Sequence, residues 1–393
     1  MPDYPDDLEQ IVAELNQAAT GSRDLRPDTL PKPHFNTGAS AGLSSLDQLL
    51  ALAVRRAASD LLLIAGAPVT LRIGGVLAPA TGPPLGGEEA RNLLLPLLSQ
   101  VQSRELQSAK SVDFCFTRDG IGRFRANIHH QRGTVAGSIR LLPEKVPTLE
   151  ALHLPPALRR FAEARQGLVL ITGSTGCGKS STLAALIDLI NTQRHDHVVT
   201  IEDPVEFVHA NRQSVIEQIE VGVDAPDFAG SLRSILRQNP DVILVGEMRD
   251  PETIAMVLTA AETGHLVLST LHTNDTSQAV SRILDSFPSS NQPQIRQQLS
   301  LALLAIVAQQ LVPGASGARY PAVEILMATT GVRNLIRKGE DHQLYTALST
   351  GRAEGMITME QSLAEMTRSG RISRETAMAH GFRSESLLRY LED

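Results

Sequence analysis

Eight residues near the middle of the chain, Gly173-Ser-Thr-Gly-Cys-Gly-Lys-Ser180, most constrain what this sequence can fold into. They follow an apolar run from Gly167 to Thr172 and precede a helical pattern from Ser181 to Ile190. Strand, glycine-rich loop and helix in this order form the context in which such a loop binds nucleotide phosphates. The glycines let successive backbone N–H groups turn toward an anion, and the positive end of the helix dipole adds to the attraction. The sequence therefore predicts that ATP or GTP binds here.

Each residue of this segment has an expected part in binding. Lys179 is expected to reach the β- and γ-phosphates, and the Ser180 hydroxyl to bind Mg²⁺. Cys177 occupies a variable loop position that tolerates a small side chain, so alkylation of its thiol is expected to block ATPase activity. The predicted nucleotide-binding residues are Gly173, Ser174, Thr175, Gly176, Cys177, Gly178, Lys179, Ser180 and Ser181.

Composition restricts the partners and the compartment. A chain of 393 residues suggests about two or three domains. Its net charge of −7 gives no general attraction to nucleic acid, so no nucleic-acid partner is expected. Cys115 and Cys177 are the two cysteines, which leaves neither a disulfide framework nor a cysteine zinc site and fits a reducing cytosol. The acidic start does not resemble a secretory signal, and the longest apolar run, Leu299 to Val312, is shorter than the about 20 residues of a membrane span. We expect a cytoplasmic protein that meets a membrane only peripherally.

Changes in pattern along the chain predict five segments. Short β-like runs indicate a small α+β domain, and four prolines between 143 and 156 disfavour helix and central strand. Apolar runs then alternate with helical patterns, which predicts a parallel sheet covered by helices, and beyond Tyr320 the pattern turns helical. The expected segments are a flexible extension (1–43), an α+β domain (44–142), a linker (143–156), an α/β domain (157–330) and a helical region (331–393).

Two sets of strands are expected within these domains. In the small domain they are Leu61–Ala65, Val69–Ile73, Phe114–Thr117, Arg123–His129 and Gly137–Leu142. In the α/β domain they are Gly167–Thr172, Val198–Ile201, Asp241–Val245 and His265–Leu271.

Carboxylates follow two strands of the predicted parallel sheet, where ligands of such sheets bind. The segment Ile201-Glu-Asp-Pro-Val-Glu206 supplies three, and Glu206 is the preferred base to orient and deprotonate the attacking water. Carboxylates that only decorate a surface turn are the alternative. After the next strand, Gly246 fills the slot that usually holds an Asp, which leaves Glu247 to serve Mg²⁺ through a coordinated water. By its slot alone Glu247 could equally be the base, and both assignments stay open.

Two histidines flank the last of these strands. Seven steps along a strand separate His265 and His272 by about 23 Å, so they cannot share one phosphate. His272, at the carboxyl end, is the expected γ-phosphate sensor. His265 is expected to serve packing or an interface.

Three arginines of the small domain are further catalytic candidates. Alternation along a strand puts Arg123 and Arg125 on one face, and Arg140 lies on the next expected strand. Their guanidinium groups could supply charge to a nucleotide bound elsewhere, whereas the alternative is a solvated or salt-bridged strand face.

Together these residues resemble a known family, the secretion and type IV pilus motor ATPases, and within it the PilT and PilU retraction group. The resemblance implies a RecA-like P-loop NTPase core, a smaller N-terminal PAS-like α+β domain, a C-terminal helical region and a hexameric ring. It also implies Glu206 as base, Glu247 at Mg²⁺, a histidine box with His265 and His272, and small-domain arginines that reach a neighbour's nucleotide. The segments that carry it are 58–61, 123–127, 172–180, 201–209, 240–250 and 261–273.

Two features favour retraction motors within this family. The segment from Gln310 to Arg319 lacks the four-cysteine zinc module usual in extension and secretion ATPases, and Gly331-Val-Arg-Asn-Leu-Ile336 is similar to a PilT signature. The resemblance implies a hexameric, ATP-hydrolysing motor for pilus retraction and twitching motility, with Mg²⁺ as cofactor. It would act on an inner-membrane platform protein, peripherally at the inner face of the cytoplasmic membrane, and a paralogous retraction ATPase is a further candidate partner. The alternatives are a pilus-assembly or type II secretion ATPase and a nucleotide-binding accessory subunit with little turnover; PilT-like and PilU-like assignments both stay open.

Overall fold

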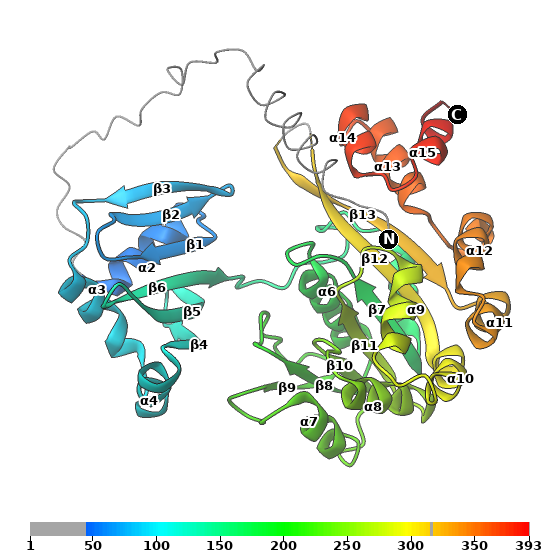
Figure 1. The fold of residues 1–393 in the computed structure, drawn as a ribbon, viewed down its shortest axis with the longest axis horizontal. Helices are drawn as coiled ribbons and strands as arrows, with labels where there is room; N and C mark the ends of the chain where they lie inside the picture. Colours follow the sequence, from blue (N-terminus) through cyan, green and yellow to red (C-terminus); the bar gives the residue numbers. More distant parts are fainter. Residues whose placement is uncertain (1–44, 315–316, 393) are drawn as a thin grey trace, which may run out of the picture.

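The computed structural model describes residues 45–314 and 317–392, which form two β-sheets with their helices (Figure 1). The extension expected over residues 1–43 lies outside the described residues. Residues 143–155 contain no helix or strand and connect the last strand of the first sheet to the second unit. Among the described helices none is both long enough and apolar enough to cross a bilayer.

The first sheet has six strands in the order β3-β2-β1-β6-β5-β4, and all neighbours are antiparallel. Its core contains the fully buried Leu50, Leu61 and Phe124. The strands are β1 (Asp60–Leu63), β2 (Val69–Ile73), β3 (Val76–Thr81), β4 (Ser111–Arg118), β5 (Gly122–Gln131) and β6 (Thr134–Leu142), with helices α2 (Leu46–Arg55), α3 (Gly87–Leu94), η1 (Leu95–Leu97) and α4 (Gln100–Ala109).

All five strands expected in the small domain are present, and β3 is an additional one. It escaped the sequence pattern because Pro79 lies within it and Gly74-Gly75 precedes it. Proline cannot donate to a ladder, but an edge strand such as β3 tolerates it.

The second sheet has seven strands in the order β13-β12-β7-β11-β10-β8-β9. The four expected strands are confirmed and run parallel to one another, and β9 and β12 extend this parallel arrangement. The sequence did not indicate β13, which runs antiparallel to β12 at one edge. β13 continues to Met327, so the helical pattern expected beyond Tyr320 begins only at residue 330. The strands are β7 (Gly167–Thr172), β8 (His197–Glu202), β9 (Val215–Glu220), β10 (Val242–Val245), β11 (Leu266–Leu271), β12 (Leu303–Pro313) and β13 (Arg319–Met327).

Helices cover both faces of this sheet, which is why every residue of β7, β10 and β11 is buried (Figure 1). Successive residues of one strand pack on opposite faces of the sheet. Leu170 of β7 lies in a core with α8 and α9, whereas Ile171 lies in a core with α5 and α6. The helices are η2 (Pro156–Leu158), α5 (Arg159–Glu163), α6 (Lys179–Gln193), α7 (Phe228–Ile235), α8 (Pro251–Glu262), α9 (Thr276–Asp285) and α10 (Gln292–Ala302).

The C-terminal part is helical, as expected, from residue 330 onward. Its last three helices form a small core with Val312 of β12 and Ala322 of β13, so they are attached to the antiparallel edge of the sheet. The elements are α11 (Thr330–Lys338), η3 (Asp341–Gln343), α12 (Leu344–Thr350), η4 (Arg352–Glu354), α13 (Met359–Arg368), α14 (Arg374–His380) and α15 (Ser384–Glu392).

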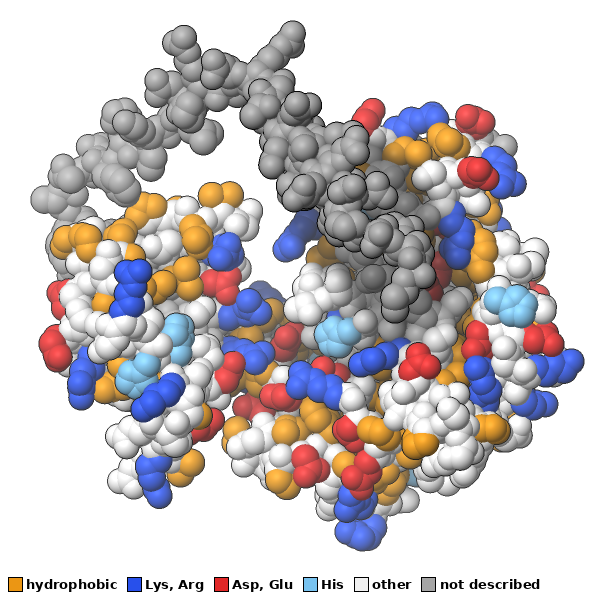
Figure 2. Space-filling view, viewed as in Figure 1, with side chains coloured by type: hydrophobic (Ala, Val, Ile, Leu, Met, Phe, Trp, Pro, Cys, Tyr) orange, Lys and Arg blue, Asp and Glu red, His pale blue; other side chains and the backbone are white. Residues whose placement is uncertain are grey.

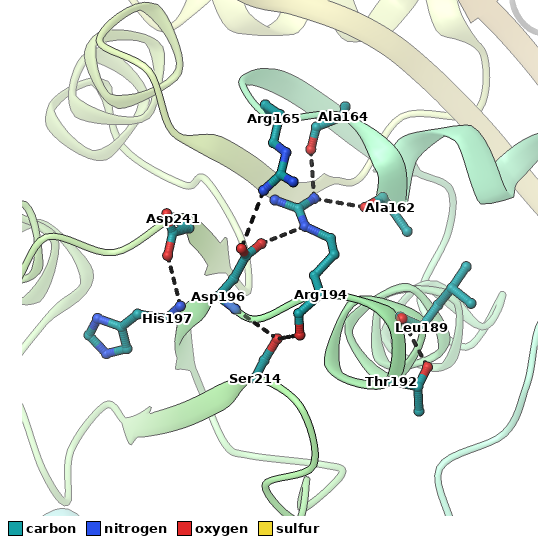
Figure 3. Close-up of polar contacts among 10 residues, drawn as sticks. All are labelled: Ala162, Ala164, Arg165, Leu189, Thr192, Arg194, Asp196, His197, Ser214 and Asp241. Carbon is teal, nitrogen blue, oxygen red and sulfur yellow. Dashed lines mark hydrogen bonds and ion pairs between the residues drawn. The ribbon is translucent and has the colours of Figure 1, made fainter.

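A buried ion pair joins the elements that meet just before β8 (Figure 3). Arg194 Nε lies 2.5 Å from Asp196 Oδ2, and the two side chains are only 9% and 5% exposed. The same guanidinium donates to the carbonyls of Ala162 and Ala164, both at 2.7 Å, at the C-terminal end of α5. Ser214, just before β9, donates to the Arg194 carbonyl at 2.7 Å and accepts from the Asp196 N–H. The pair thus ties the end of α6 to α5 and to the starts of β8 and β9.

We predict that Asp196→Ala destabilises the protein by about 3–5 kcal/mol, because it leaves the Arg194 charge buried without its partner. The denaturant midpoint of the nucleotide-free protein measures this. Arg165→Ala is the control, because Arg165 contacts the same carboxylate at 3.4 Å from a side chain that is 77% exposed, and should cost about 1 kcal/mol or less. Equal midpoints for the two variants would contradict the anchoring role of the buried pair.

Candidate nucleotide-binding site

Four neighbouring parallel strands bring the predicted site segments to one edge of the second sheet. In the ladder Thr172 of β7 pairs with Leu271 of β11, and Val245 of β10 pairs with both Ser269 and Ile201. Each strand ends within a few residues of these pairs, and strands are about 4.8 Å apart. The phosphate loop (residues 173–178), His272, Glu247 and the acidic loop (residues 203–209) therefore follow adjacent strand ends in this order.

The phosphate loop has a geometry suited to an anion. Gly178 has a positive φ of 94° and directly precedes α6, a helix of 15 residues whose first turn carries Lys179, Ser180 and Ser181. Residues 174–176 are exposed, so their backbone is open to a ligand. Lys179 Nζ donates to the carbonyls of Gly173 (2.8 Å) and Ser174 (3.1 Å), which holds the ammonium against the loop. The residues fit a nucleotide phosphate group, because loop, helix end and ammonium converge.

The Cys177 thiol, whose alkylation is expected to block ATPase activity, is buried in the structure. Cys177 is only 3% exposed. Burial raises the pKa of its thiol, although the nearby Lys179 charge opposes the shift. A buried thiol with a raised pKa reacts slowly, since the thiolate is the nucleophile. Block by alkylation therefore requires the phosphate loop to open first.

The carboxylates of the acidic segment are in different environments. Glu202 accepts hydrogen bonds from Thr200 and Gln218, and burial raises its pKa, with the nearby Glu206 charge adding to the rise. The half-buried Glu206 carboxylate, by contrast, has no hydrogen bond or ion pair within residues 45–314 and 317–392. Of the two, Glu206 is the carboxylate free to accept a proton from a water.

Glu247 lies between the side chains of Arg249 and His272. Its Oε1 pairs with Arg249, and its Oε2 is 3.4 Å from His272 Nε2, while the glutamate side chain itself is 13% exposed. Gly246 before it has no room for a larger residue without adjustment, because an added Cβ would lie 3.2 Å from the Ile201 carbonyl. The close approach of β8 and β10 explains why glycine occupies this slot. Ser180 and Glu247 offer the oxygen ligands that Mg²⁺ prefers, directly or through water.

The two histidines lie at opposite ends of β11. His272 follows the strand at the phosphate-loop edge and contacts Glu247, whereas His265 precedes the strand and its Nδ1 is 2.9 Å from the Ala260 carbonyl at the end of α8. The packing environment of His265 agrees with its expected role. The structure brings only His272 to the site.

Of the three arginines, Arg123 is the one that hydrogen-bonds to the acidic loop in the described part of the chain. It donates to the carbonyls of Val205 (3.0 Å) and Glu206 (3.4 Å) in the acidic loop of its own chain. Arg125 and Arg140 pair instead with Asp113 and Asp60 within the first sheet. Figure 2 shows basic side chains and carboxylates along the side where the two sheets face each other.

Two buried polar residues next to the site were not singled out from the sequence as site residues. Gln309 of β12 contacts the phosphate loop. Glu324 of β13, 1% exposed, accepts from the Thr276 N–H (3.0 Å) and hydroxyl (2.8 Å) at the start of α9, and burial raises its pKa. The available signal was a polar residue within an otherwise apolar run. It was missed because neither β12 nor β13 was recognised as a strand from the sequence.

We predict that acid destabilises the folded protein through His209 of the acidic loop. Burial lowers its pKa from 6.5 to about 4, so between these values the unfolded chain binds more protons and stability falls as the pH falls. The thermal midpoint of the wild type should therefore drop more between pH 7 and pH 5 than that of His209→Asn. His342→Asn, at an exposed position, is the control and should respond as the wild type does. Identical pH profiles for all three proteins would exclude this contribution.

The chain is similar to proteins of a known family. Residues 138–380 match the family model described as type II/IV secretion system protein. The chain is 41% identical to the type IV pilus retraction ATPase PilT of Pseudomonas aeruginosa over 84% of this chain and 96% of that protein. It is 40% identical to the type IV pilus ATPase PilU of the same organism, over 85% and 88%. A crystal structure of the pilus retraction motor PilT with bound ADP superposes with a TM-score of 0.82 at 41% identity, covering 88% of this chain and 99% of that one.

These similarities extend across both sheets, from the six-stranded sheet to the C-terminal helices, and are not limited to the phosphate loop. The chain belongs to the type II/IV secretion system protein family and, within it, to the group of pilus ATPases that contains PilT and PilU.

Proposed function

We propose that this chain is an ATP-hydrolysing motor that powers type IV pilus retraction and thereby twitching motility. The observation that carries the proposal is similarity to PilT over most of this chain and nearly all of PilT. A phosphate loop, an unpaired carboxylate and a charge-paired carboxylate at one sheet edge support it. The RecA-like arrangement is that of a mechanical ATPase in which small movements at the nucleotide are passed to neighbouring domains.

The chain's own residues suggest a division of labour in hydrolysis. Lys179, now bound to loop carbonyls, would exchange them for phosphate oxygens when ATP enters. Glu206 would accept the proton of the attacking water, because its carboxylate is not already engaged. Glu247 would face the metal, oriented by Arg249 and His272, and His272 would contact the terminal phosphate. Mg²⁺, when bound, supplies charge neutralisation at the phosphates, with Ser180 and Glu247 as its protein-side partners.

Arg123 suggests how the reaction couples to movement. It links the six-stranded sheet to the acidic loop through hydrogen bonds to the carbonyls of Val205 and Glu206. A change in that loop on ATP binding would break or strengthen these contacts and so shift the first sheet about residues 143–155. We propose the same segments as expected from the sequence: a PAS-like domain (44–142), a linker (143–156), a RecA-like domain (157–330) and a helical region (331–393).

The assembly and partners follow from the family. We propose a homo-hexamer in which Arg125 and Arg140 exchange their present partners for the nucleotide of a neighbour. The ring would act at the inner face of the cytoplasmic membrane on a platform protein of the pilus machine, with a paralogous retraction ATPase as a further candidate partner. A pilus-assembly or type II secretion ATPase and an accessory subunit with little turnover are the competing functions.

We predict that Glu206→Gln lowers ATP turnover by about 10²–10⁴-fold while ATP affinity stays near the wild-type value, because the amide cannot take the proton. Steady-state hydrolysis without DNA and equilibrium binding of a fluorescent ATP analogue measure the two quantities. Glu217→Gln is the control, because Glu217 is a half-exposed carboxylate on β9 paired with His197. Near-normal hydrolysis by Glu206→Gln would move the base assignment to Glu247.

Deletion of the gene separates the competing functions. Loss of a retraction motor should leave surface fibres in excess and stop twitching, whereas loss of an assembly motor should remove the fibres. Unchanged fibres and motility, with no turnover by the well-formed oligomer, would favour the accessory subunit over the motor.

A further inference from the structure

Gln309 lies directly behind the phosphate loop, on the strand next to β7. Gln309 is only 4% exposed, and both the nitrogen and the oxygen of its amide form hydrogen bonds. Nε2 donates to the Cys177 carbonyl at 2.7 Å, and Oε1 accepts from the Thr182 hydroxyl of α6 at 2.8 Å. One side chain therefore connects the loop to the first turns of the helix that follows it.

The backbone of the loop also packs closely against Gln309. A Cβ added at Gly173 would lie only 2.2 Å from the Gln309 carbonyl oxygen, and one added at Gly178 would lie 2.9 Å from Gln309 Nε2. The close contact with Gln309 thus favours glycine at both positions, in addition to the open backbone that an anion needs. Gln309 forms a wall against which the loop is fitted.

The hydrogen bond to Cys177 has a consequence for the anion-facing side of the loop. In a planar trans peptide the C=O and the following N–H point in opposite directions. Because Gln309 holds the Cys177 carbonyl toward the strand, the N–H of Gly178 is directed away from it, toward the concave side of the loop. Backbone N–H groups on that side are the donors that bind phosphates in such loops.

We propose that Gln309 is a positioning residue for nucleotide binding, which fixes the Cys177–Gly178 peptide and the start of α6 in the phosphate-binding orientation. An amide suits this role because it donates and accepts at the same time. Its removal would leave the Cys177 carbonyl and the Thr182 hydroxyl with fewer buried partners and let the peptide rotate. The loop would then have to be ordered by the nucleotide, at the expense of affinity.

The neighbouring Gln310 provides a matched control. It has the same side chain on the same strand but points to the opposite face, where its amide contacts the His380 carbonyl (3.0 Å) and imidazole (3.4 Å) of α14. Methionine resembles glutamine in length but can neither donate nor accept as the amide does. Gln309→Met and Gln310→Met therefore remove the same chemistry from two sides of one strand.

We expect Gln309→Met to weaken ATP and ADP binding at least tenfold and to raise KM for ATP more than it lowers kcat. Gln310→Met should bind both nucleotides within twofold of the wild type. Titration of full-length protein with fluorescent ATP and ADP analogues, together with steady-state kinetics, measures these values. The split between KM and kcat separates a positioning role from general damage to the fold, which would reduce the amount of active protein and leave KM unchanged.

Gln309→Glu tests the same contact without shortening the side chain and serves if the methionine variant does not fold. The carboxylate can still accept from Thr182 but opposes the Cys177 carbonyl and adds negative charge behind the loop, so binding should weaken at least tenfold. Wild-type affinity in a folded Gln309→Met or Gln309→Glu variant would overturn the inference. The inference rests on the nucleotide binding of the proposed function: absence of ATP binding by the wild type would instead refute that function.

Discussion

The common carboxyl edge of the parallel strands is the constraint on which the rest of the molecule depends. β7, β11, β10 and β8 are hydrogen-bonded neighbours in register, so the phosphate loop, His272, Glu247 and the acidic loop meet although they are far apart in sequence. The strands hold this register because apolar side chains on both faces are buried against helices. A slip of one residue would turn each strand's buried side chains to the other face and move every site residue along the edge.

Two buried polar side chains near this edge each fix a defined neighbouring segment. Gln309 and Glu324 lie in two adjacent strands, yet one faces the phosphate loop and the other the start of α9. A buried polar group without partners costs free energy, so such residues persist where they fix a neighbouring segment. The opposite end of the sheet uses the same principle, since Arg194 and Asp196 pair where α5, α6, β8 and β9 meet. Buried polar contacts thus fix neighbouring segments at both ends of the sheet.

The relation between the two sheets is of a different kind. Arg123 contacts carbonyl oxygens of the acidic loop, a pair of hydrogen bonds that can form and break, while the intervening residues 143–155 have no regular structure. The other two arginines are held by carboxylates of their own sheet. A motor needs such a connection, because a domain fixed by a large apolar interface could not respond to the nucleotide. The two carbonyl contacts therefore connect the first sheet to the loop that carries Glu206.

The sequence by itself determined the phosphate loop, four central strands and the acidic and histidine segments, because these features are local: glycine spacing, apolar runs, and polar residues at their ends. It did not reveal β12 and β13, because Leu299–Val312 contains both a helix end and a strand, and an apolar run alone does not distinguish them. For the same reason Gln309 and Glu324 were missed, and β3 was hidden by its proline. Only the tertiary structure decided which carboxylate is free and which is paired, which arginine reaches the acidic loop, and that Cys177 is buried. These properties depend on groups brought together from distant segments, and no local pattern encodes them.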